Sequence, residues 1–318
     1  MSTHSVDVIK ISEIIPHPNA DNLEIVKIND YSCCVRKGDF SIGELAVYVS
    51  PDFLVNTTLP EFSFLDKPRI KVRKLRGVYS QGLLVKARPE MQEGQNVMEE
   101  LSIVRYEPPM IGQKLGPSES EKAPDLQIPC YDLENFRKYS KVFKEGEDVI
   151  ISEKLHGTNS RFVWHNDRIY CGSHKQWKKE GQNVWWNALE QNPWIMNWCK
   201  DNPDKILFGE IFGYVQELRY GAKAGQYFFN AFDVFDNGKY WDANRFFFHN
   251  LYILNIVPIL YHGPLDFGML EELSCGKSTI PGAGHIKEGI VIKPTLERYN
   301  EECGRVALKL VSNEYLCK

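Results

Sequence analysis

The chain has 318 residues, of which 43% are hydrophobic and 25% are charged. This length allows two domains that each bury a core, and this composition excludes a wholly disordered chain. The formal net charge of −4 argues against a uniformly basic protein that coats nucleic acid, so any nucleic-acid contact must come from local basic clusters.

The eight cysteines form no C-x-x-C pair, so they are expected to be reduced thiols rather than zinc ligands or a redox centre. The first residues carry no secretion signal, and no stretch is apolar enough to span a bilayer. We therefore expect no membrane partner and a cytoplasmic location, or a nuclear one in a host with a nucleus. We also expect a monomer.

The first hundred residues consist of short β-rich runs separated by turn residues. The runs are residues 6–15, 23–28, 31–36, 44–49, 70–75 and 82–86. Several short strands in so few residues predict a small β-barrel over residues 1–105.

One of these runs alternates basic and apolar side chains. A strand there would place Arg69, Lys71 and Arg73 on one face. This basic stripe could bind phosphates, with Tyr79 stacking on a base, or it could be a solvated strand that only protects a sheet edge. The residues predicted to contact nucleic acid here are Arg69, Lys71, Arg73, Lys74 and Arg76.

Residues 106–128 collect prolines, glycines and charges without a period, which predicts a linker. A second domain is expected over residues 129–318, with helices near 133–143 and 184–199 and another opened by Asp242 as N-cap. Its expected strands are residues 148–152, 206–212, 227–235, 256–261, 289–293 and 305–311. Because strands and helices do not alternate regularly, the predicted class is α+β.

Lys154 follows an apolar strand and precedes a turn, in the run E-K-L-H-G-T-N over residues 153–159. A lysine with an ordinary pKa of about 10.4 becomes a nucleophile at neutral pH only if its surroundings disfavour the ammonium form. Gly157 allows a tight turn beside a ligand, and the amide of Asn159 can bond a ribose hydroxyl. Alone, the motif could equally be a surface lysine next to a turn.

Acidic and basic residues recur inside later apolar strands, where a buried charge is costly unless it is paired. These residues are Glu210, Asp233, Glu288, Lys293 and Lys309. Each could be a salt-bridged strand residue. Together, carboxylates that hold hydrated Mg²⁺ or Mn²⁺ and lysines that neutralise phosphate are what phosphoryl transfer to an amine requires.

The series of motifs resembles those of ATP-dependent polynucleotide ligases and capping enzymes, and E-K-x-H-G-T-N has the form typical of RNA ligases. The resemblance covers nearly all of residues 129–318 and implies an ATP-grasp-like nucleotidyltransferase domain of antiparallel sheets with flanking helices. His156 replaces the aspartate usual in DNA ligases and capping enzymes.

The resemblance also implies which residues bind the nucleotide. Lys154 would take AMP from ATP, Glu153 would lie against the adenine, and Asn159 would contact the ribose. Phe232 would stack on the adenine, and Glu210 would hold the ribose or a metal-bound water.

For the metal and the phosphates, the resemblance implies two further groups of residues. Asp233 and Glu288 would bind waters of a catalytic Mg²⁺ or Mn²⁺ together with Glu210, while Lys293 and Lys309 would grip phosphate. Many ligases carry a second lysine where Val311 stands here, and Arg305 or Lys293 is expected to compensate.

Two further segments match RNA ligase patterns. Ser173 and His174 match the next ligase motif and would touch the nucleotide or the RNA end. Residues 17–28 and 75–83 resemble OB-folds of the tRNA-binding type. An OB domain in front of such a ligase domain resembles the fifth family of RNA ligases, which seal nicks.

The expected activity is therefore the ATP-dependent joining of a 5′-phosphate to a 3′-hydroxyl through lysyl-AMP and an adenylated 5′ end. The expected partner is RNA, as a nicked duplex with an RNA 3′-hydroxyl strand. Two alternatives remain at this stage. A DNA ligase or capping guanylyltransferase would use the same lysine chemistry, and a non-enzymatic RNA-binding OB protein would explain the first hundred residues alone.

Overall fold

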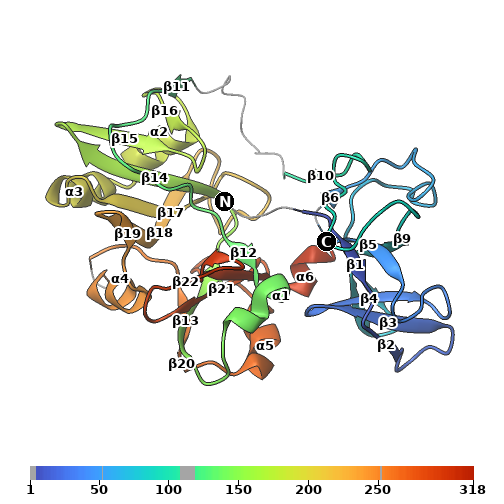
Figure 1. The fold of residues 1–318 in the computed structure, drawn as a ribbon. Helices are drawn as coiled ribbons and strands as arrows, with labels where there is room; N and C mark the ends of the chain where they lie inside the picture. Colours follow the sequence, from blue (N-terminus) through green and yellow to red (C-terminus); the bar gives the residue numbers. More distant parts are fainter. Residues whose placement is uncertain (1–4, 52, 108–118, 251–252) are drawn as a thin grey trace. The chain divides into compact units, whose positions relative to one another are not determined.

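The computed structural model describes residues 5–51, 53–107, 119–250 and 253–318. The chain divides into two compact units (Figure 1). Of the described residues, the barrel unit comprises residues 5–51, 53–107, 137–140 and 313–318, and the motif unit comprises residues 119–136, 141–250 and 253–312.

The barrel unit contains short strands and two short helical segments. Its elements are β1 (Val8–Lys10), β2 (Glu13–Pro16), β3 (Leu23–Ile28), β4 (Tyr31–Arg36), β5 (Leu45–Val49), β6 (Phe53–Leu54), β7 (Val72–Leu75), β8 (Val78–Gln81), β9 (Leu83–Lys86), β10 (Val104–Arg105), most of α1 (Phe136–Tyr139) and α6 (Asn313–Leu316).

The barrel strands form small antiparallel sheets in the orders β1-β5-β9 and β2-β3-β4, with the pairs β7-β8 and β6-β10. Side chains join neighbouring sheets, because the Ser32 amide of β4 donates to Gln81 of β8 at 2.8 Å. Val26 and Val49 are fully buried in the interior. The predicted first strand, residues 6–15, is wrong in its continuity, since it divides into β1 and β2.

The hairpin between β7 and β8 turns at Arg76 and Gly77, whose φ angles are 45° and 95°. Positive φ at both central residues suits the twist of a tight hairpin. The preceding loop stabilises this turn, because Asn19 Nδ2 donates to the Arg76 carbonyl at 2.9 Å and the His17 ring lies 3.2 Å from the Leu75 carbonyl. His17 and Asn19, which belong to the segment that resembles tRNA-binding OB-folds, therefore stabilise the β7–β8 hairpin.

The motif unit combines two larger sheets with helices. Its elements are β11 (Ser120–Glu121), β12 (Glu134–Asn135), a 3-10 turn (Ser140–Val142), β13 (Asp148–Lys154), β14 (Thr158–His165), β15 (Arg168–Gly172), β16 (Trp177–Lys178), α2 (Val184–Gln191), α3 (Trp194–Asp201), β17 (Ile206–Gly213), β18 (Tyr227–Asp236), β19 (Lys239–Tyr240), α4 (Ala243–Asn250), β20 (Ile259–Pro264), a 3-10 turn (Phe267–Met269), α5 (Leu270–Ser274), β21 (Gly289–Pro294), β22 (Tyr299–Asn300), β23 (Gly304–Arg305) and β24 (Leu308–Val311).

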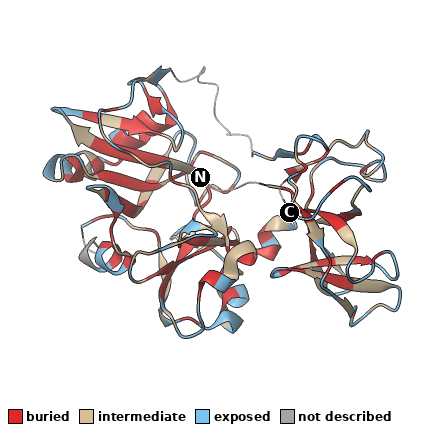
Figure 2. Ribbon diagram, in the orientation of Figure 1, coloured by how far each residue is buried: buried red, intermediate tan, exposed pale blue. Residues whose placement is uncertain are grey.

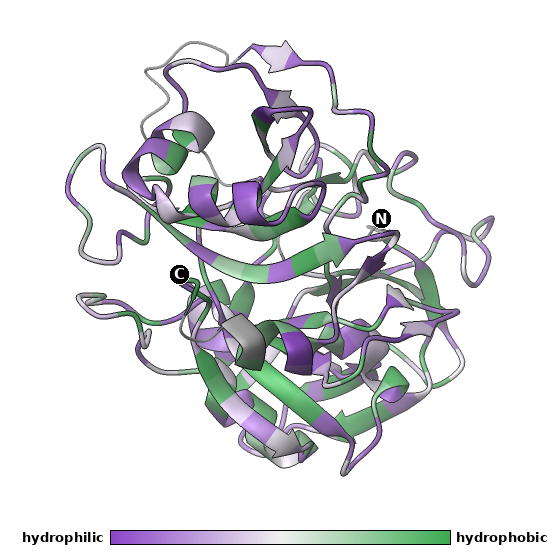
Figure 3. Cartoon of the chain, turned by 90° about the vertical axis from the view of Figure 1, so that its left-hand side faces the viewer, coloured by the Kyte–Doolittle hydropathy of each residue, from purple (hydrophilic) through white to green (hydrophobic). Residues whose placement is uncertain are grey.

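The larger sheet has the order β11-β16-β15-β14-β17-β18-β19, and the smaller has the order β12-β24-β21-β13-β20. Helices α2 and α3 pack on the larger sheet. The central strands of both sheets are mostly buried (Figure 2), and strands of this unit are coloured as hydrophobic over much of their length in Figure 3. Mixed sheets and helices without βαβ repeats fit the predicted α+β class.

Several predicted elements differ from the structure; for example, the predicted strand over residues 305–311 divides into β23 and β24. The predicted helix over residues 184–199 is two helices, because Asn192-Pro193 interrupts the pattern and proline cannot continue a helix. The expected linker, residues 106–128, contains strand β11, while residues 108–118 lie outside the described residues. In addition, the structure groups residues 313–318 with the barrel unit.

The segment before β13 also packs more firmly than its composition predicted. Leu126, Ile128 and Tyr131 contact a buried cluster on the larger sheet that includes Phe208. Among the described residues, no helix combines the length and the apolar character needed to cross a membrane.

Candidate active site

Lys154 is the last residue of β13, and its backbone pairs with Gly289 at the start of β21. Its Nζ atom donates a hydrogen bond to Glu288 Oε1 at 2.7 Å. Glu288 directly precedes β21, and its carboxylate faces the lysine. The structure thus brings the predicted nucleophile and a predicted acidic residue into direct contact.

His156 completes the contacts of Glu288, with Nδ1 3.4 Å from Oε2. Burial alone would raise the pKa of the Glu288 carboxyl, but the positive charge of Lys154 and the hydrogen bond and charge of His156 lower this pKa to about 2. Glu288 is therefore an anion at neutral pH, held between two residues of the lysine motif.

Gly157 lies so close to β17 that an added Cβ would be 2.0 Å from the Ile211 carbonyl oxygen. Only glycine fits this approach. Its backbone amide donates to the Glu210 carboxyl, and burial raises the pKa of that carboxyl to about 8 although Lys154 opposes the shift and Glu288 adds to it. Glu210 is thus the second predicted acid that the structure brings to Lys154.

Asn159 pairs directly with Glu210 across β14 and β17, and Arg161 follows two residues later on the same face. Among the described residues, neither Asn159 Oδ1 nor Arg161 Nε has a hydrogen-bond partner, although both atoms are buried. Arg161 stacks on Trp177 at 4.3 Å, and burial lowers the pKa of its guanidinium to about 10. An acceptor and a donor are therefore available on this face.

Glu153 lies on the opposite face of β13 from Lys154, because neighbouring strand residues alternate. Its carboxylate accepts hydrogen bonds from Ser278 Oγ at 2.5 Å, from the Thr279 amide at 2.8 Å and from Thr279 Oγ1 at 2.7 Å. Both carboxylate oxygens are engaged by the segment that precedes β21, and the expected contact of Glu153 with adenine stays a prediction.

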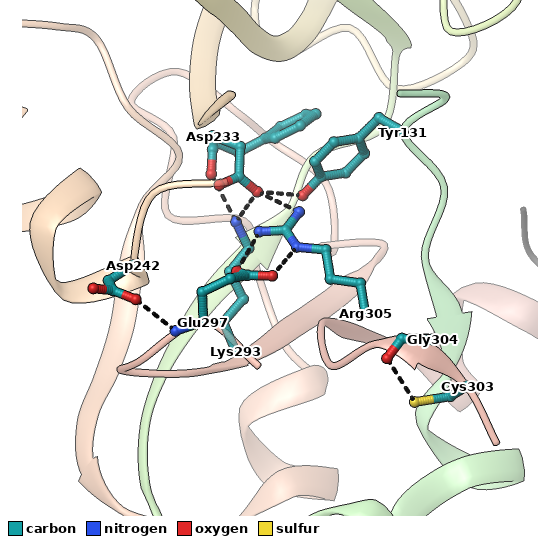
Figure 4. A network of polar contacts seen from close by, with 9 residues as sticks. Tyr131, Asp233, Asp242, Lys293, Glu297, Cys303, Gly304 and Arg305 are labelled. Carbon is teal, nitrogen blue, oxygen red and sulfur yellow. Dashed lines mark hydrogen bonds and ion pairs between the residues drawn. The ribbon is translucent and has the colours of Figure 1, made fainter. Parts of the chain in front are cut away.

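Asp233 belongs to a separate buried network, shown in Figure 4. Its Oδ2 atom accepts from the Tyr131 hydroxyl at 2.7 Å, from Lys293 Nζ at 2.6 Å and from Arg305 NH1 at 2.9 Å. Arg305 also forms two hydrogen bonds to Glu297, at 2.7 and 2.8 Å. Two carboxylates and two cations therefore balance each other.

This network contains three of the residues expected to bind metal or phosphate. Burial would raise the pKa of Asp233, but Arg305 and Lys293 outweigh it and hold the pKa below its ordinary value. Lys293 pairs with Ile150, four residues from Lys154 along β13, or roughly 13 Å at the usual rise per residue. Asp233 and Glu297 together balance the charges of Lys293 and Arg305, and the expected metal and phosphate contacts of these residues stay predictions.

The remaining expected nucleotide contacts are spread over both sheets. Lys309 pairs with Val291, and Val311 pairs with Gly289, so Lys309 shares a sheet face with Lys154. Phe232 is half-buried against Tyr131, with ring centroids 4.7 Å apart. The nucleotide contacts of Phe232 and Lys309 stay predictions, and Arg305, expected to compensate for the lysine absent at Val311, is paired with Asp233 and Glu297.

Ser173 and His174 form a turn between β15 and β16. The Gln176 amide donates to Ser173 Oγ at 3.1 Å, and Cys130 Sγ donates to the His174 carbonyl at 3.4 Å. These contacts stabilise the turn, and its expected contact with the nucleotide or RNA end stays a prediction.

In the barrel unit, only residues 72–75 of the basic run form a strand, and Ile70 and Val72 are buried. Arg69, Lys71 and Arg73 alternate with these buried residues, but two of the three already contact other groups of the protein. The Arg69 guanidinium lies 3.8 Å from the Tyr106 ring centre, and Lys71 donates to the backbone carbonyl of Lys318 at 2.6 Å. Three members are exposed, namely Arg73, Lys74 and Arg76.

Sequence reasoning missed several residues that contact the lysine motif. Tyr220 accepts a hydrogen bond from the His156 backbone amide at 2.7 Å. Ser278 and Thr279 donate hydrogen bonds to the Glu153 carboxylate. None of these residues lies in a recognised motif, so the sequence carries no local signal for them. Arg161 is different, because a charged residue inside an apolar strand is itself a signal of a functional or paired group.

Within the described residues, no group of three or more histidine, cysteine, aspartate or glutamate side chains is arranged to hold a metal ion. Of the three expected acidic residues, only Glu210 and Glu288 share a site. Their carboxylates fit a divalent ion in the donor type that Mg²⁺ and Mn²⁺ prefer, whereas Asp233 lies in the separate network with Lys293 and Arg305.

The RNA ligase family model matches residues 147–311, just over half of the chain and all of the strands that carry the site. The chain belongs to the RNA ligase family. An OB-fold domain model matches residues 5–87, which confirms the predicted OB-fold for the barrel unit of this RNA ligase. Together the two domains imply RNA as the substrate of the ligase.

Solved structures agree with the fold. A variant of Naegleria gruberi RNA ligase with ATP and Mn has a TM-score of 0.79 and 23% identity, covering 98% of both chains. A variant without ligand has a TM-score of 0.81 and 23% identity, covering 99% of this ligase and 98% of that chain. The same Naegleria enzyme with PPi has a TM-score of 0.79 and 24% identity, covering 98% and 97%. No curated protein matches the chain.

Proposed function

We propose that this RNA ligase uses ATP to form lysyl-AMP on Lys154 and seals nicks whose 3′-hydroxyl strand is RNA. The observation that carries the proposal is the contact between Lys154 Nζ and Glu288 Oε1 inside a group of motif residues. The Naegleria gruberi RNA ligase structures with ATP and Mn and with PPi support the same nucleotide and a divalent ion here.

In the first step, the Lys154 ammonium loses a proton and its nitrogen attacks the α-phosphorus of ATP. A phosphorus–nitrogen bond forms, and the bond to pyrophosphate breaks. AMP then passes from Lys154 to the 5′-phosphate of the RNA, and the 3′-hydroxyl finally displaces AMP as the phosphodiester forms. Covalent catalysis divides one difficult joining step into easier ones.

The neighbouring side chains have distinct parts in this scheme. Glu288 orients the Lys154 amine through the 2.7 Å hydrogen bond. Asn159 Oδ1 is a buried acceptor for a ribose hydroxyl, and Lys309 is a cation for phosphate on the Lys154 face. A divalent ion held by Glu210 and Glu288 would neutralise charge on the transferred phosphate.

The test of the nucleotide chemistry is the intact mass of the protein after incubation with ATP and Mg²⁺. Wild type is expected to gain one AMP, and Lys154→Ala is expected to gain none. GTP replaces ATP in a parallel sample, because a GMP adduct would favour the capping-type alternative and contradict the proposed nucleotide.

The substrate is tested with matched nicked duplexes that differ only in the 3′-hydroxyl strand. Faster sealing of the nick with an RNA 3′-hydroxyl strand supports the proposal. Equal sealing of an all-DNA nick would contradict the RNA part while leaving the lysine chemistry intact.

A further inference from the structure

Tyr220 contacts the lysine motif from outside all the motifs found in the sequence. Its side chain is 2% exposed, and its hydroxyl accepts a hydrogen bond from the backbone amide of His156 at 2.7 Å. His156 is two residues after Lys154 and faces Glu288, so this hydrogen bond acts on the turn that directs the lysine.

The backbone at Tyr220 adopts a strained conformation. Its φ angle is 51°, a left-handed conformation that costs free energy for a bulky aromatic residue. At Gly221, φ is 76°, and an added Cβ would lie 2.9 Å from the Gly282 carbonyl oxygen. Close packing with the segment before β21 therefore accompanies the strained conformation.

His285 links Tyr220 to the same segment. The Tyr220 amide donates to His285 Nε2 at 3.3 Å, and the two rings meet edge to face with centroids 4.4 Å apart. His285 Nδ1 lies 2.9 Å from the Ile286 carbonyl, which is consistent with a proton on Nδ1 and an acceptor at Nε2. Because Glu288 is three residues farther on, Tyr220 connects the segments that carry Lys154 and Glu288.

The same segment also holds the other side of Lys154. Ser278 and Thr279 bind the Glu153 carboxylate through three hydrogen bonds. Residues on both sides of the lysine are therefore tied to residues 276–287, one side directly and the other through Tyr220.

We propose that Tyr220 is a positioning residue for adenylation: its hydroxyl fixes the His156–Gly157 turn so that Lys154 Nζ and the Glu288 carboxylate meet. This inference rests on the proposed transfer of AMP to Lys154. A small displacement of a reacting group can lower a rate by about 100-fold, so the loss of one buried hydrogen bond at this turn should slow the chemical step. Binding of ATP should change little, because Tyr220 acts through the backbone of His156.

The test compares Tyr220→Phe with wild type and with Tyr214→Phe. The first variant removes only the hydroxyl and keeps the ring that packs against His285. Tyr214, in the same segment, packs against Arg219 through its ring and has no hydroxyl contact to the lysine motif among the described residues. Single-turnover formation of the AMP adduct is measured over a range of ATP concentrations, together with the thermal midpoint of unfolding.

Tyr220→Phe is expected to lower the maximal rate by about 10- to 100-fold, with a KM for ATP within about twofold of wild type. Tyr214→Phe should retain the wild-type rate. An unchanged maximal rate would overturn the inference, and so would a slower reaction that results only from a higher KM for ATP. Failure of wild type itself to form an adduct would instead overturn the proposed function, and this inference with it.

Amide hydrogen exchange provides a second measurement that does not depend on turnover. In Tyr220→Phe, the peptide containing His156 should exchange faster than in wild type, because its amide loses a buried acceptor. Equal protection of this peptide in the two proteins would overturn the inference even if the adenylation rate had fallen.

Discussion

Lys154 Nζ lies 2.7 Å from Glu288 Oε1 across 134 positions of the sequence. Lys154 ends β13 and Glu288 directly precedes β21, and the pairing of these two strands aligns Lys154 with Gly289. An amine held by a carboxylate that stays ionised, because its pKa is about 2, is oriented before the nucleotide arrives.

Glu288→Gln should keep the shape of this contact and remove its charge. We expect the rate of AMP transfer to Lys154 to fall by at least about 100-fold, since a preorganised charge at the reacting group is lost. The measurement is the single-turnover rate of adduct formation. Glu272→Gln on the exposed surface of α5 is the matched control, and a wild-type rate in Glu288→Gln would contradict the assigned role.

Asp233→Asn should destabilise the protein rather than act on the chemistry alone. It would leave Lys293 and Arg305 buried beside a neutral side chain, and breaking such a pair typically costs about 3–5 kcal/mol. Urea unfolding measures the change. Glu119→Gln, which removes an exposed partner of Lys179, should cause no measurable change, and equal midpoints for Asp233→Asn and wild type would count against the network.

The pH dependence of stability should report Glu210. Its pKa is raised to about 8 in the folded protein, above the ordinary value of about 4.3, so the folded state binds the proton more tightly than the unfolded state. This contribution is fully present below about pH 4 and is lost as pH rises through about 8. It should amount to a few kcal/mol at most.

Unfolding free energies between pH 5 and 9, measured with a chelator, test this expectation. Wild type should lose more stability than Glu210→Gln as the pH rises, because the glutamine cannot ionise. A bound divalent ion should reduce the difference by favouring the carboxylate. Parallel curves for the two proteins in chelator would contradict the raised pKa.

Arg161→Met should separate stability from function. The Arg161 guanidinium is buried, and its Nε atom has no hydrogen-bond partner among the described residues. Substitution by an apolar side chain should therefore leave the free energy of unfolding unchanged or raise it by about 1–2 kcal/mol. If the arginine serves a ligand, ligation should fall at the same time. Urea unfolding and nick sealing are measured on one preparation, and a large loss of stability would indicate a structural role instead.

The double variant Arg73→Ala and Lys74→Ala tests the exposed part of the basic stripe. Loss of two phosphate contacts should weaken RNA binding about equally for all sequences and lower the salt dependence of the affinity. AMP transfer to Lys154 in the absence of RNA should stay at the wild-type rate. An unchanged salt dependence would favour the alternative of a solvated strand.

Much of the fold followed from local patterns. Short β-rich runs predicted the barrel, and the OB-fold match confirms it. The strands around Lys154 and Glu210 were predicted within a few residues, because long apolar runs between turn residues leave few other conformations. The exceptions were also local, as at Pro193, where one expected helix became two.

By itself, the sequence determined which residue types could carry the chemistry, and it predicted Lys154, within an RNA ligase motif, as the nucleophile. Tertiary structure decided the partners. It joined Glu210 and Glu288 to Lys154, drew Asp233 and Lys293 into a separate neutral network, and recruited Tyr220. The physical reason is that charge pairing and buried hydrogen bonds depend on which strands become neighbours, and residues far apart in the chain carry no local signal of that pairing.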